Sequence, residues 1–207
     1  MKHVRFPLMA MVVAAFLPAG FSTLRTADAP RDGERAVYKV DKAHSWIGFK
    51  VRHLGVSNVQ GQFKAYDAAL EMEGDDLSTL KANVTIDVAS VDTGVERRDN
   101  DLRSERFFDA ATYPEMTFVS KTVRNIDGET FELVGDLTIK DVTKEVTLDA
   151  EYLGRARMGD SERVGFSAET KINRKDFHLN FDRLTEAGGF VVGHDVRIIL
   201  EIEAVRQ

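Results

Sequence analysis

The sequence of 207 residues contains no cysteine. Disulfide bonds, thiolate metal sites and thiol catalysis are therefore excluded. The chain also lacks a run of about 20 consecutive apolar residues, the length that a helix needs to span a bilayer. Nor does it have an excess of positive charge, because its formal net charge is −6. Nucleic acid is not an expected partner, since binding to phosphates requires a basic face.

The first 29 residues have the features of a secretory signal peptide followed by a loose leader. Lys2 and Arg5 precede the short apolar run Leu8–Leu17, and small residues follow it. Cleavage after Ser22 or after Ala29 fits the pattern. We expect an exported protein without a transmembrane anchor in its mature form.

Residues 36–207 are predicted to form a single domain, in which apolar and polar residues alternate in eight stretches. A period of two places successive side chains on opposite faces of a strand, so each stretch predicts a strand with one buried face. The stretch from Gly74 to Leu80 is polar and predicts a loop. The eight expected strands span 44–53, 59–65, 84–88, 116–120, 131–139, 146–152, 164–172 and 196–204.

Short turns join most of these stretches, and none is followed by the long helical crossover of a parallel sheet. This favours an all-β antiparallel barrel or sandwich, and the length of the strands favours the barrel. A barrel of eight strands is wide enough either for its own side chains or for one small ligand.

The central segment interrupts the strands. Glu96–Arg106 is charged and free of glycine and proline, which predicts a short helix with Asp92 or Thr93 as its N-cap. Phe107 and Phe108 follow as an aromatic anchor. We interpret the segment as a cap on one end of the barrel.

A ligand cavity inside the barrel is favoured by small residues at inward positions, which leave room for a guest. These residues are Gly61, Ala65, Gly135, Ala150 and Ala168. The alternative is a barrel filled by its own side chains, which would serve as a scaffold for other proteins. The residues expected to line a tunnel for an apolar ligand are Ile47, Phe49, Val51, Phe63, Val84, Ile86, Phe107, Phe108, Phe118, Leu137, Ile139, Phe166, Phe177, Phe181 and Ile198.

Three arginines in the irregular segments are candidates for a ligand headgroup: Arg98, Arg103 and Arg174. The planar guanidinium suits phosphate and carboxylate oxygens. The alternative is that these arginines fasten loops by pairing with nearby carboxylates, namely those of Asp99, Asp101, Glu105 and Asp176.

Catalysis and metal binding are not predicted. Asp41, His44 and Ser45 have the residue types of a hydrolytic triad, but the chain has no Gly-x-Ser-x-Gly elbow. We expect His44 and Ser45 to tie down the start of a strand. The histidines lack tight ligand spacing, so no metal or cofactor is expected; a lipid or ester hydrolase is the less favoured alternative.

Several stretches, in order and at natural spacing, resemble the YceI-like family of exported polyisoprenoid- and lipid-binding proteins. The resemblance covers residues 38–205. The matching pieces are DKAHS at 41–45, FKVRHLGVS at 49–57, VQGQF at 59–63, the pattern RD, LRS and FFD over 98–109, YP at 113–114, GDLTI at 135–139, GFSA at 165–168 and INRKDF at 172–177.

The resemblance implies an eight-stranded, lipocalin-like antiparallel barrel with a tunnel for a long polyisoprenoid, such as an isoprenoid quinone. It also implies a periplasmic location, a homodimer in many members, and no agreed catalytic activity. Two positions depart from the family pattern: Asp101 stands where many relatives have histidine, and His178 stands where glycine is common. We therefore expect a periplasmic binding or carrier protein.

Overall fold

The computed structural model describes residues 34–186 and 188–207. The expected signal peptide and leader lie outside this part of the chain. The described residues form one α-helix, α1 (Glu96–Arg103), and two 3-10 turns, η1 (Val88–Ser90) and η2 (Arg174–Phe177). Their strands are β1 (Arg35–Val40), β2 (Trp46–His53), β3 (Ser57–Phe63), β4 (Tyr66–Glu73), β5 (Asp76–Asp87), β6 (Val91–Asp92), β7 (Glu115–Asp127), β8 (Thr130–Ile139), β9 (Val142–Met158), β10 (Ser161–Asn173) and β11 (Val192–Arg206).

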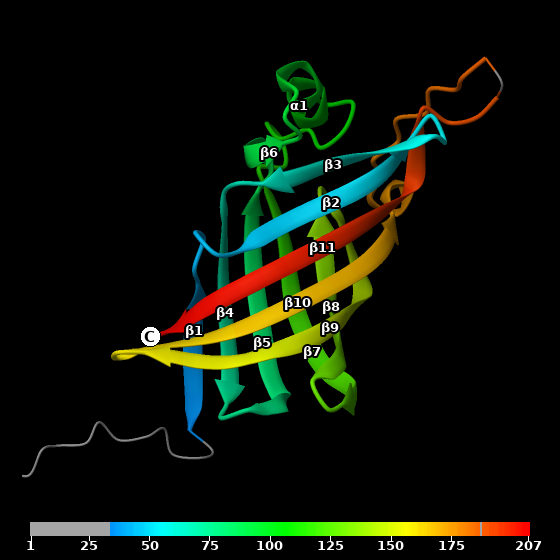
Figure 1. The fold of residues 1–207 in the computed structure, drawn as a ribbon. Coiled ribbons are helices and arrows are strands. Elements are labelled where there is room, and N and C mark those ends of the chain that lie inside the picture. The colour runs from blue at the N-terminus through cyan, green and yellow to red at the C-terminus, as the bar shows by residue number, and fades with distance from the viewer. Residues whose placement is uncertain (1–33, 187) are drawn as a thin grey trace, which may run out of the picture.

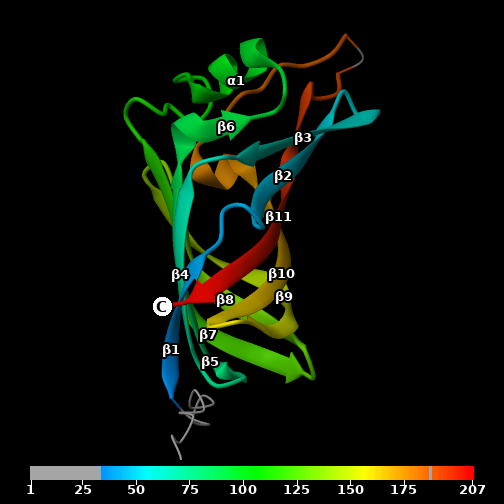
Figure 2. The same cartoon turned by 60° about the vertical axis from the view of Figure 1, so that its left-hand side comes forward.

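Eight of the strands close into an antiparallel barrel. In ring order they are β1, β4, β5, β7, β8, β9, β10 and β11. The ring closes where β11 pairs with β1, with Tyr38 opposite Arg206 and Val40 opposite Ala204. Figures 1 and 2 show these strands wrapped around one interior. The predicted all-β, eight-stranded, lipocalin-like barrel is confirmed.

β11 has two partners on the same edge. Its last residues pair with β1, whereas residues 192–201 pair with β2. β2 forms the predicted hairpin with β3, with Val51 opposite Val59, and β3 pairs in turn with the short β6. The sheet therefore continues beyond the ring, and β2, β3 and β6 wall the upper part of the molecule in Figure 1, beneath α1.

The predicted number of strands in the barrel is right, but the described residues form eleven strands in all, and the eight in the ring are not the eight that were predicted. The expected strands at 44–53 and 59–65 are β2 and β3, which lie outside the ring of eight. β1 and β4 lie inside the ring and were not predicted. In β4 the inward residues do alternate, but alanine and glutamate, which are uncommon in strands, hide the period. The buried residues of β4 are Tyr66, Ala68, Leu70 and Met72.

The loop predicted over Gly74–Leu80 is wrong for most of its length. Only its first two residues form a turn, and β5 begins at Asp76. Leu77 and Leu80, three positions apart, are both buried, and the register between β4 and β5 shifts at this end. A bulge of this kind breaks the period of two, so no alternation is visible in the sequence.

The cap helix exists but is shorter and capped differently than predicted. The helix expected over Glu96–Arg106 ends three residues earlier. Its N-cap is Val95, with no side-chain cap hydrogen bond, so the prediction of Asp92 or Thr93 is wrong. Here a side chain of the helix accepts from the residues before it: the buried carboxylate of Asp99 accepts a hydrogen bond of 2.9 Å from the Thr93 amide.

Candidate functional site

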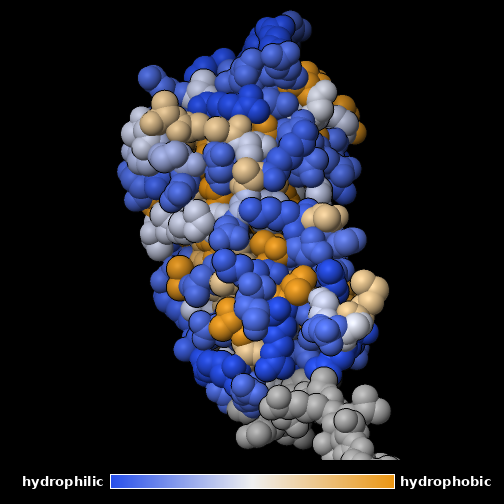
Figure 3. Space-filling view, turned by 90° about the vertical axis from the view of Figure 1, so that its left-hand side faces the viewer, coloured by the Kyte–Doolittle hydropathy of each residue, from blue (hydrophilic) through white to orange (hydrophobic). Residues whose placement is uncertain are grey.

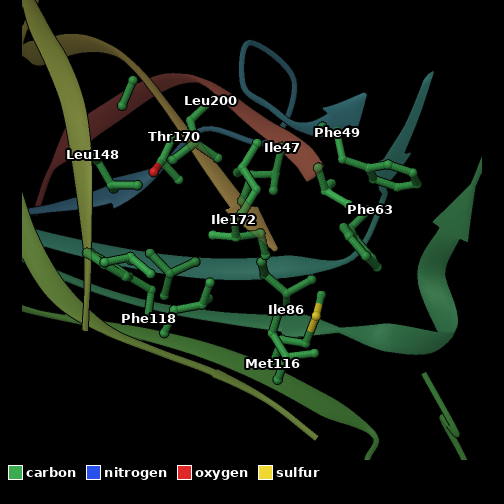
Figure 4. A pocket seen from close by; sticks show the side chains of 18 of the residues that line it. Ile47, Phe49, Phe63, Ile86, Met116, Phe118, Leu148, Thr170, Ile172 and Leu200 are labelled. Carbon is green, nitrogen blue, oxygen red and sulfur yellow. The ribbon is translucent and has the colours of Figure 1, made fainter. Parts of the chain in front are cut away.

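An apolar cavity occupies the interior of the barrel. Its volume is about 210 Å³, and 35 residues line it. They come from nine strands, from α1 and its following loop, and from the segment that begins with η2. Figure 4 shows that side chains from opposite walls, Leu200 and Phe118 among them, point into one space. Sequence alone did not decide between a cavity and a filled core, and the structure has the cavity.

The cavity wall is almost free of polar side chains. Among the 35 lining residues, only Ser167, Thr170 and Arg174 have side chains with polar groups. A polar ligand buried there would lose its hydrogen bonds to water without replacement, which costs several kcal/mol per group on the scale of transfer to hydrocarbon, roughly 4–8. The wall therefore suits a long apolar molecule.

Thirteen of the fifteen residues predicted to line a tunnel do line the cavity. The exceptions are Phe177 and Phe181. Phe177 is buried in the core next to the cavity, and Phe181 packs on Phe107 with ring centroids 4.8 Å apart. Both residues pack in the protein without lining the cavity. The thirteen that line it are Ile47, Phe49, Val51, Phe63, Val84, Ile86, Phe107, Phe108, Phe118, Leu137, Ile139, Phe166 and Ile198.

One part of the wall was missed because its strands were missed. β4 and the part of β5 before the predicted strand at 84–88 contribute Ala68, Leu70, Leu80 and Ala82. The alternation of apolar residues from Tyr66 onward was the available signal, and two alanines and three acidic residues weaken it. Contact of any of these residues with a lipid stays a prediction.

Aromatic rings join the cap to the upper end of the cavity. Phe108, which follows α1, meets Phe63 edge to face at 5.8 Å, and Phe63 lies 5.9 Å from Phe49. Figure 4 shows Phe49 and Phe63 side by side at one end of the cavity. The expected aromatic anchor is therefore present, because the segment after α1 places its rings in the wall.

The inward glycines do not make room for a guest, contrary to the expectation from sequence. A Cβ at Gly135 would lie 2.5 Å from the Phe118 ring, and one at Gly61 would lie 2.4 Å from the Phe49 ring. Each glycine makes room for an aromatic ring of the protein itself. Of the small residues considered, only Ala150 and Ala168 line the cavity.

Arg174 holds the upper end of the barrel together. Only 3% of its surface is exposed, and burial lowers the pKa of its guanidinium. Nε donates to the Gly193 carbonyl at 2.9 Å, Nη1 donates to Leu179, and Nη2 donates to Phe181 at 2.7 Å and to Val192 at 3.3 Å. Arg174 therefore fastens the segment after η2 while lining the cavity.

Arg98 and Arg103 lie outside the cavity wall and fasten the cap. Arg98 donates to the hydroxyl and the carbonyl of Thr93 at 2.7 and 2.9 Å. Arg103 donates to the carbonyls of Ala89 and Val91 at 2.6 and 2.7 Å. The loop-fastening alternative fits both, although the partners are mainly carbonyls and not the carboxylates expected. Neither arginine lines the cavity, and a headgroup role for the two stays a prediction.

The two departures from the family pattern do not line the cavity. Asp101 forms an ion pair of 2.8 Å with Arg106. His178 has a φ of 57°, in the left-handed region that glycine adopts most readily, and its Nδ1 lies 3.2 Å from the carboxylate of Asp141. This hydrogen bond holds the pKa of Asp141 below its usual range.

Asp41, His44 and Ser45 form a fastening and not a triad. The Ser45 hydroxyl donates to the Glu203 carbonyl at 3.1 Å and accepts from the Glu203 amide at 2.9 Å, as expected for a residue that ties down a strand. His44 contacts Asp41 at 3.0 Å and not the serine. The Arg163 hydrogen bond, followed by that of His44, holds the pKa of Asp41 well below its usual range.

The same place holds the group of potential metal ligands found in residues 34–186 and 188–207, namely Asp41, His44 and Glu203. Nη1 of Arg163 lies 2.7 Å from the Asp41 carboxylate and also bonds Glu203. The guanidinium supplies the positive charge between the two carboxylates, so the geometry does not favour a cation there.

A buried charged cluster fastens the opposite end of the barrel. The Glu162 carboxylate is 3% exposed and accepts from Tyr38 at 2.8 Å, Arg155 at 2.6 Å and Arg157 at 3.1 Å. Burial raises the pKa of Glu162, but these hydrogen bonds and charges outweigh it and the net pKa is lowered. Burial, followed by the bond to Glu162, raises the pKa of Tyr38 to about 12.

The cluster extends to the turn between β4 and β5. Tyr152 donates to Asp75 in this turn at 2.8 Å, and its ring lies 5.2 Å from that of Phe166, which lines the cavity. Burial, followed by the bond to Asp75, raises the pKa of Tyr152 to about 12.

In the described part of the chain, no helix is both long and apolar enough to cross a membrane.

Comparisons with known proteins agree with this architecture. The family model of the YceI-like domain matches residues 38–204. Protein YceI of Escherichia coli is 39% identical over 178 residues, which cover 83% of this chain and 88% of that protein. The YCEI crystal structure from Campylobacter jejuni is 41% identical, with a TM-score of 0.64 over 81% of this chain and 96% of that one.

A second solved structure is similar in fold only. The polyisoprenoid binding domain from Saccharophagus degradans is 17% identical, with a TM-score of 0.60 over 83% of this chain and 99% of that one. The family match over most of the chain, together with the barrel, the cap and the apolar cavity, leads to one conclusion. This protein belongs to the YceI-like family.

Proposed function

We propose that the protein binds a long apolar lipid, a polyisoprenoid or an isoprenoid quinone, inside the barrel and shields it from water. The observation that carries the proposal is the cavity wall, in which 32 of 35 residues have no polar side-chain group. A protein of similar fold is described as a polyisoprenoid binding domain, and a ligand of that class is consistent with the proposal. No chemistry on the lipid is needed, because burial alone does the work of a carrier.

Burial of apolar surface favours long chains. Each buried CH₂ contributes about 0.8 kcal/mol, so a five-carbon isoprene unit adds a few kcal/mol before its ordering cost is subtracted. Affinity should therefore rise with every unit until the cavity is filled.

Arg174 is the group to which we assign the polar end of the lipid. A guanidinium has five N–H donors, and Arg174 uses four of them on backbone carbonyls. One N–H of Nη1 is left for an acceptor oxygen, such as that of a hydroxyl, a quinone or a phosphate. Thr170, the nearest polar side chain of the wall on β10, offers a second group. The apolar chain would then run toward Phe166.

We place this function in the periplasm. Support comes from the N-terminal sequence, with two positive charges before a short apolar run.

The test begins with the mature protein purified under mild conditions and analysed by native mass spectrometry with organic extraction. We expect a stoichiometric mass that fragments as an isoprenoid. Emptied protein is then offered geranylgeraniol and octaprenol, and octaprenol should bind at least about tenfold more tightly. Equal affinity for the two alcohols, or a barrel that refuses both, would contradict the proposal and favour a scaffold.

A further inference from the structure

Four exposed apolar side chains gather on two neighbouring loops at one end of the molecule. Leu54 and Val56, in the turn between β2 and β3, are 45% and 82% exposed; Leu184 and Phe190, between η2 and β11, are 56% and 41% exposed. We call these four residues the apolar tip. Both loops lie at the upper right of Figure 1.

The two loops of the apolar tip are held together. The Leu54 amide donates to the Val191 carbonyl at 3.0 Å, which joins one loop to the other. Leu184 and Phe190 form a β-bridge within the second loop. The Phe190 ring also lies 4.1 Å from the ring of His194. The apolar side chains are therefore presented by connected backbone.

The apolar tip continues the cavity wall. Val51 on β2 and Val192 on β11 both line the cavity. Val192 lies opposite His53, the last residue of β2, so the first loop begins where the wall ends. Phe190 precedes Val192 by two positions on the second loop. The apolar side chains of the tip therefore lie beside the end of the cavity wall that the paired strands β2 and β11 form.

Most of the other exposed apolar side chains lie on strands and not on these two loops, for example Val37 on β1 and Val119 and Ile126 on β7. On the face shown in Figure 3 they form small separate groups among hydrophilic residues. Leu153 and Met158, both well exposed, lie on β9 near its hairpin with β10. This hairpin is at the end of β10 away from Asn173, and hence at the other end from the apolar tip.

The charges beside the apolar tip do not repel a lipid surface. Residues 54–58 have no charged side chain, and Lys50 and Arg52 come just before them. In the second loop Arg183 and Glu186 have opposite charges, and Asp182 is paired with Lys175. The tip thus has no negative excess, although the chain has a net charge of −6.

From these observations we infer that the apolar tip enters the surface of a lipid bilayer and lets a lipid pass between the bilayer and the cavity without crossing water. This inference rests on the proposed function. The occupant is a bilayer because its interface accepts separate apolar side chains that project from loops, and because the tip adjoins the wall of an apolar cavity. The role of the four side chains is to bring this end of the cavity to the lipid.

The experiment compares two double variants with matched exposure. Val56→Ser with Leu184→Ser removes two side chains of the apolar tip, and Leu153→Ser with Met158→Ser removes two at the other end, which are 56% and 73% exposed. Flotation with vesicles of phosphatidylethanolamine and phosphatidylglycerol, free of isoprenoid, measures docking. Loading with octaprenol from detergent measures the cavity separately, and light scattering gives the oligomeric state.

We expect the tip variant to bind vesicles roughly tenfold more weakly than the wild type, and the control variant to bind as the wild type does. All three proteins should load octaprenol equally from detergent. From vesicles of the same two phospholipids that also contain octaprenol, only the tip variant should take it up slowly. The inference is overturned if the tip variant binds vesicles as strongly as the wild type does. It is also overturned if light scattering shows that the tip variant has lost a dimer while its vesicle binding is unchanged. Failure of all three to load octaprenol refutes the proposed function instead. A single Val56→Ser variant repeats the test if the double variant does not fold.

Discussion

Glu162 and Arg174 stand at the two ends of one inward-facing row of β10 and η2. Each is 3% exposed, and each is held by several hydrogen bonds. The two residues are twelve positions apart, which corresponds to roughly 40 Å of extended strand. The charged ends of the row bracket an apolar slot. The inward residues between them are Val164, Phe166, Ala168, Thr170 and Ile172.

Loss of Glu162 should destabilise the barrel strongly. Glu162→Ala leaves Arg155 without its buried partner, and breaking a pair of this kind costs about 3–5 kcal/mol. Urea unfolding measures the change in the free energy of unfolding. Glu151→Ala, an exposed carboxylate on β9, is the control and should change it by less than about 0.5 kcal/mol. Similar changes for the two variants would show that the cluster contributes little.

Arg174→Lys should lose most of what Arg174 provides, although the charge is kept. A lysine ammonium is compact and cannot reach four carbonyls arranged around a planar fork. Several buried carbonyls lose their partner, at about 1–3 kcal/mol each. We expect a lower melting temperature and faster amide exchange over residues 179–193. Arg98→Lys is the control, because Arg98 contacts only Thr93. A melting temperature unchanged by Arg174→Lys would contradict the fastening role.

Ala168→Phe should fill part of the cavity and so exclude the lipid, without unfolding the protein. Ala168 lies opposite Ala150 on β9 and Leu200 on β11, so two alanines lie side by side in the wall, where a ring has room. Octaprenol bound from detergent should fall at least about tenfold, since the ring displaces buried isoprene units. Glu169→Phe, on the exposed face of the same strand, should bind normally. Undiminished binding by Ala168→Phe would place the lipid elsewhere.

Stability should fall at high pH. The pKa values of Tyr38 and Tyr152 are raised from 10.0 to about 12 in the folded protein. A raised folded pKa gives stability that is complete below pH 10 and is lost as pH rises through about 12. Urea unfolding at a series of pH values should show this loss, and Tyr38→Phe with Tyr152→Phe should make it shallower. An identical slope in the double variant would assign the loss to other groups.

Strands in which apolar and polar residues alternate clearly could be predicted from sequence, and strands with weak alternation could not. β8 and β11 show long rows of branched and aromatic residues, which give a clear period. β4 has alanine and glutamate at its alternating positions, and β5 begins in a bulge, so the period disappears although the backbone is a strand.

The cavity itself was beyond a prediction from sequence alone. A filled core and a hollow one use the same apolar residues on inward faces. Gly135 illustrates the difficulty, because the space it leaves is taken by the ring of Phe118 on the neighbouring strand β7. Which rings fill such spaces depends on register between strands, and register is set only when the whole sheet has formed.

The pairing of β1 with the end of β11 has a consequence for how the chain folds. Only Tyr38, Lys39 and Val40 close the ring, and their partners are Arg206, Val205 and Ala204, far away in the sequence. Contacts so distant in sequence form late, because the intervening loop must lose its entropy first. A nascent chain can therefore build sheet as it emerges but cannot complete a barrel. Until residues 204–206 arrive it is an open sheet with two unpaired edges, and this is the stage at which the protein is most exposed to aggregation.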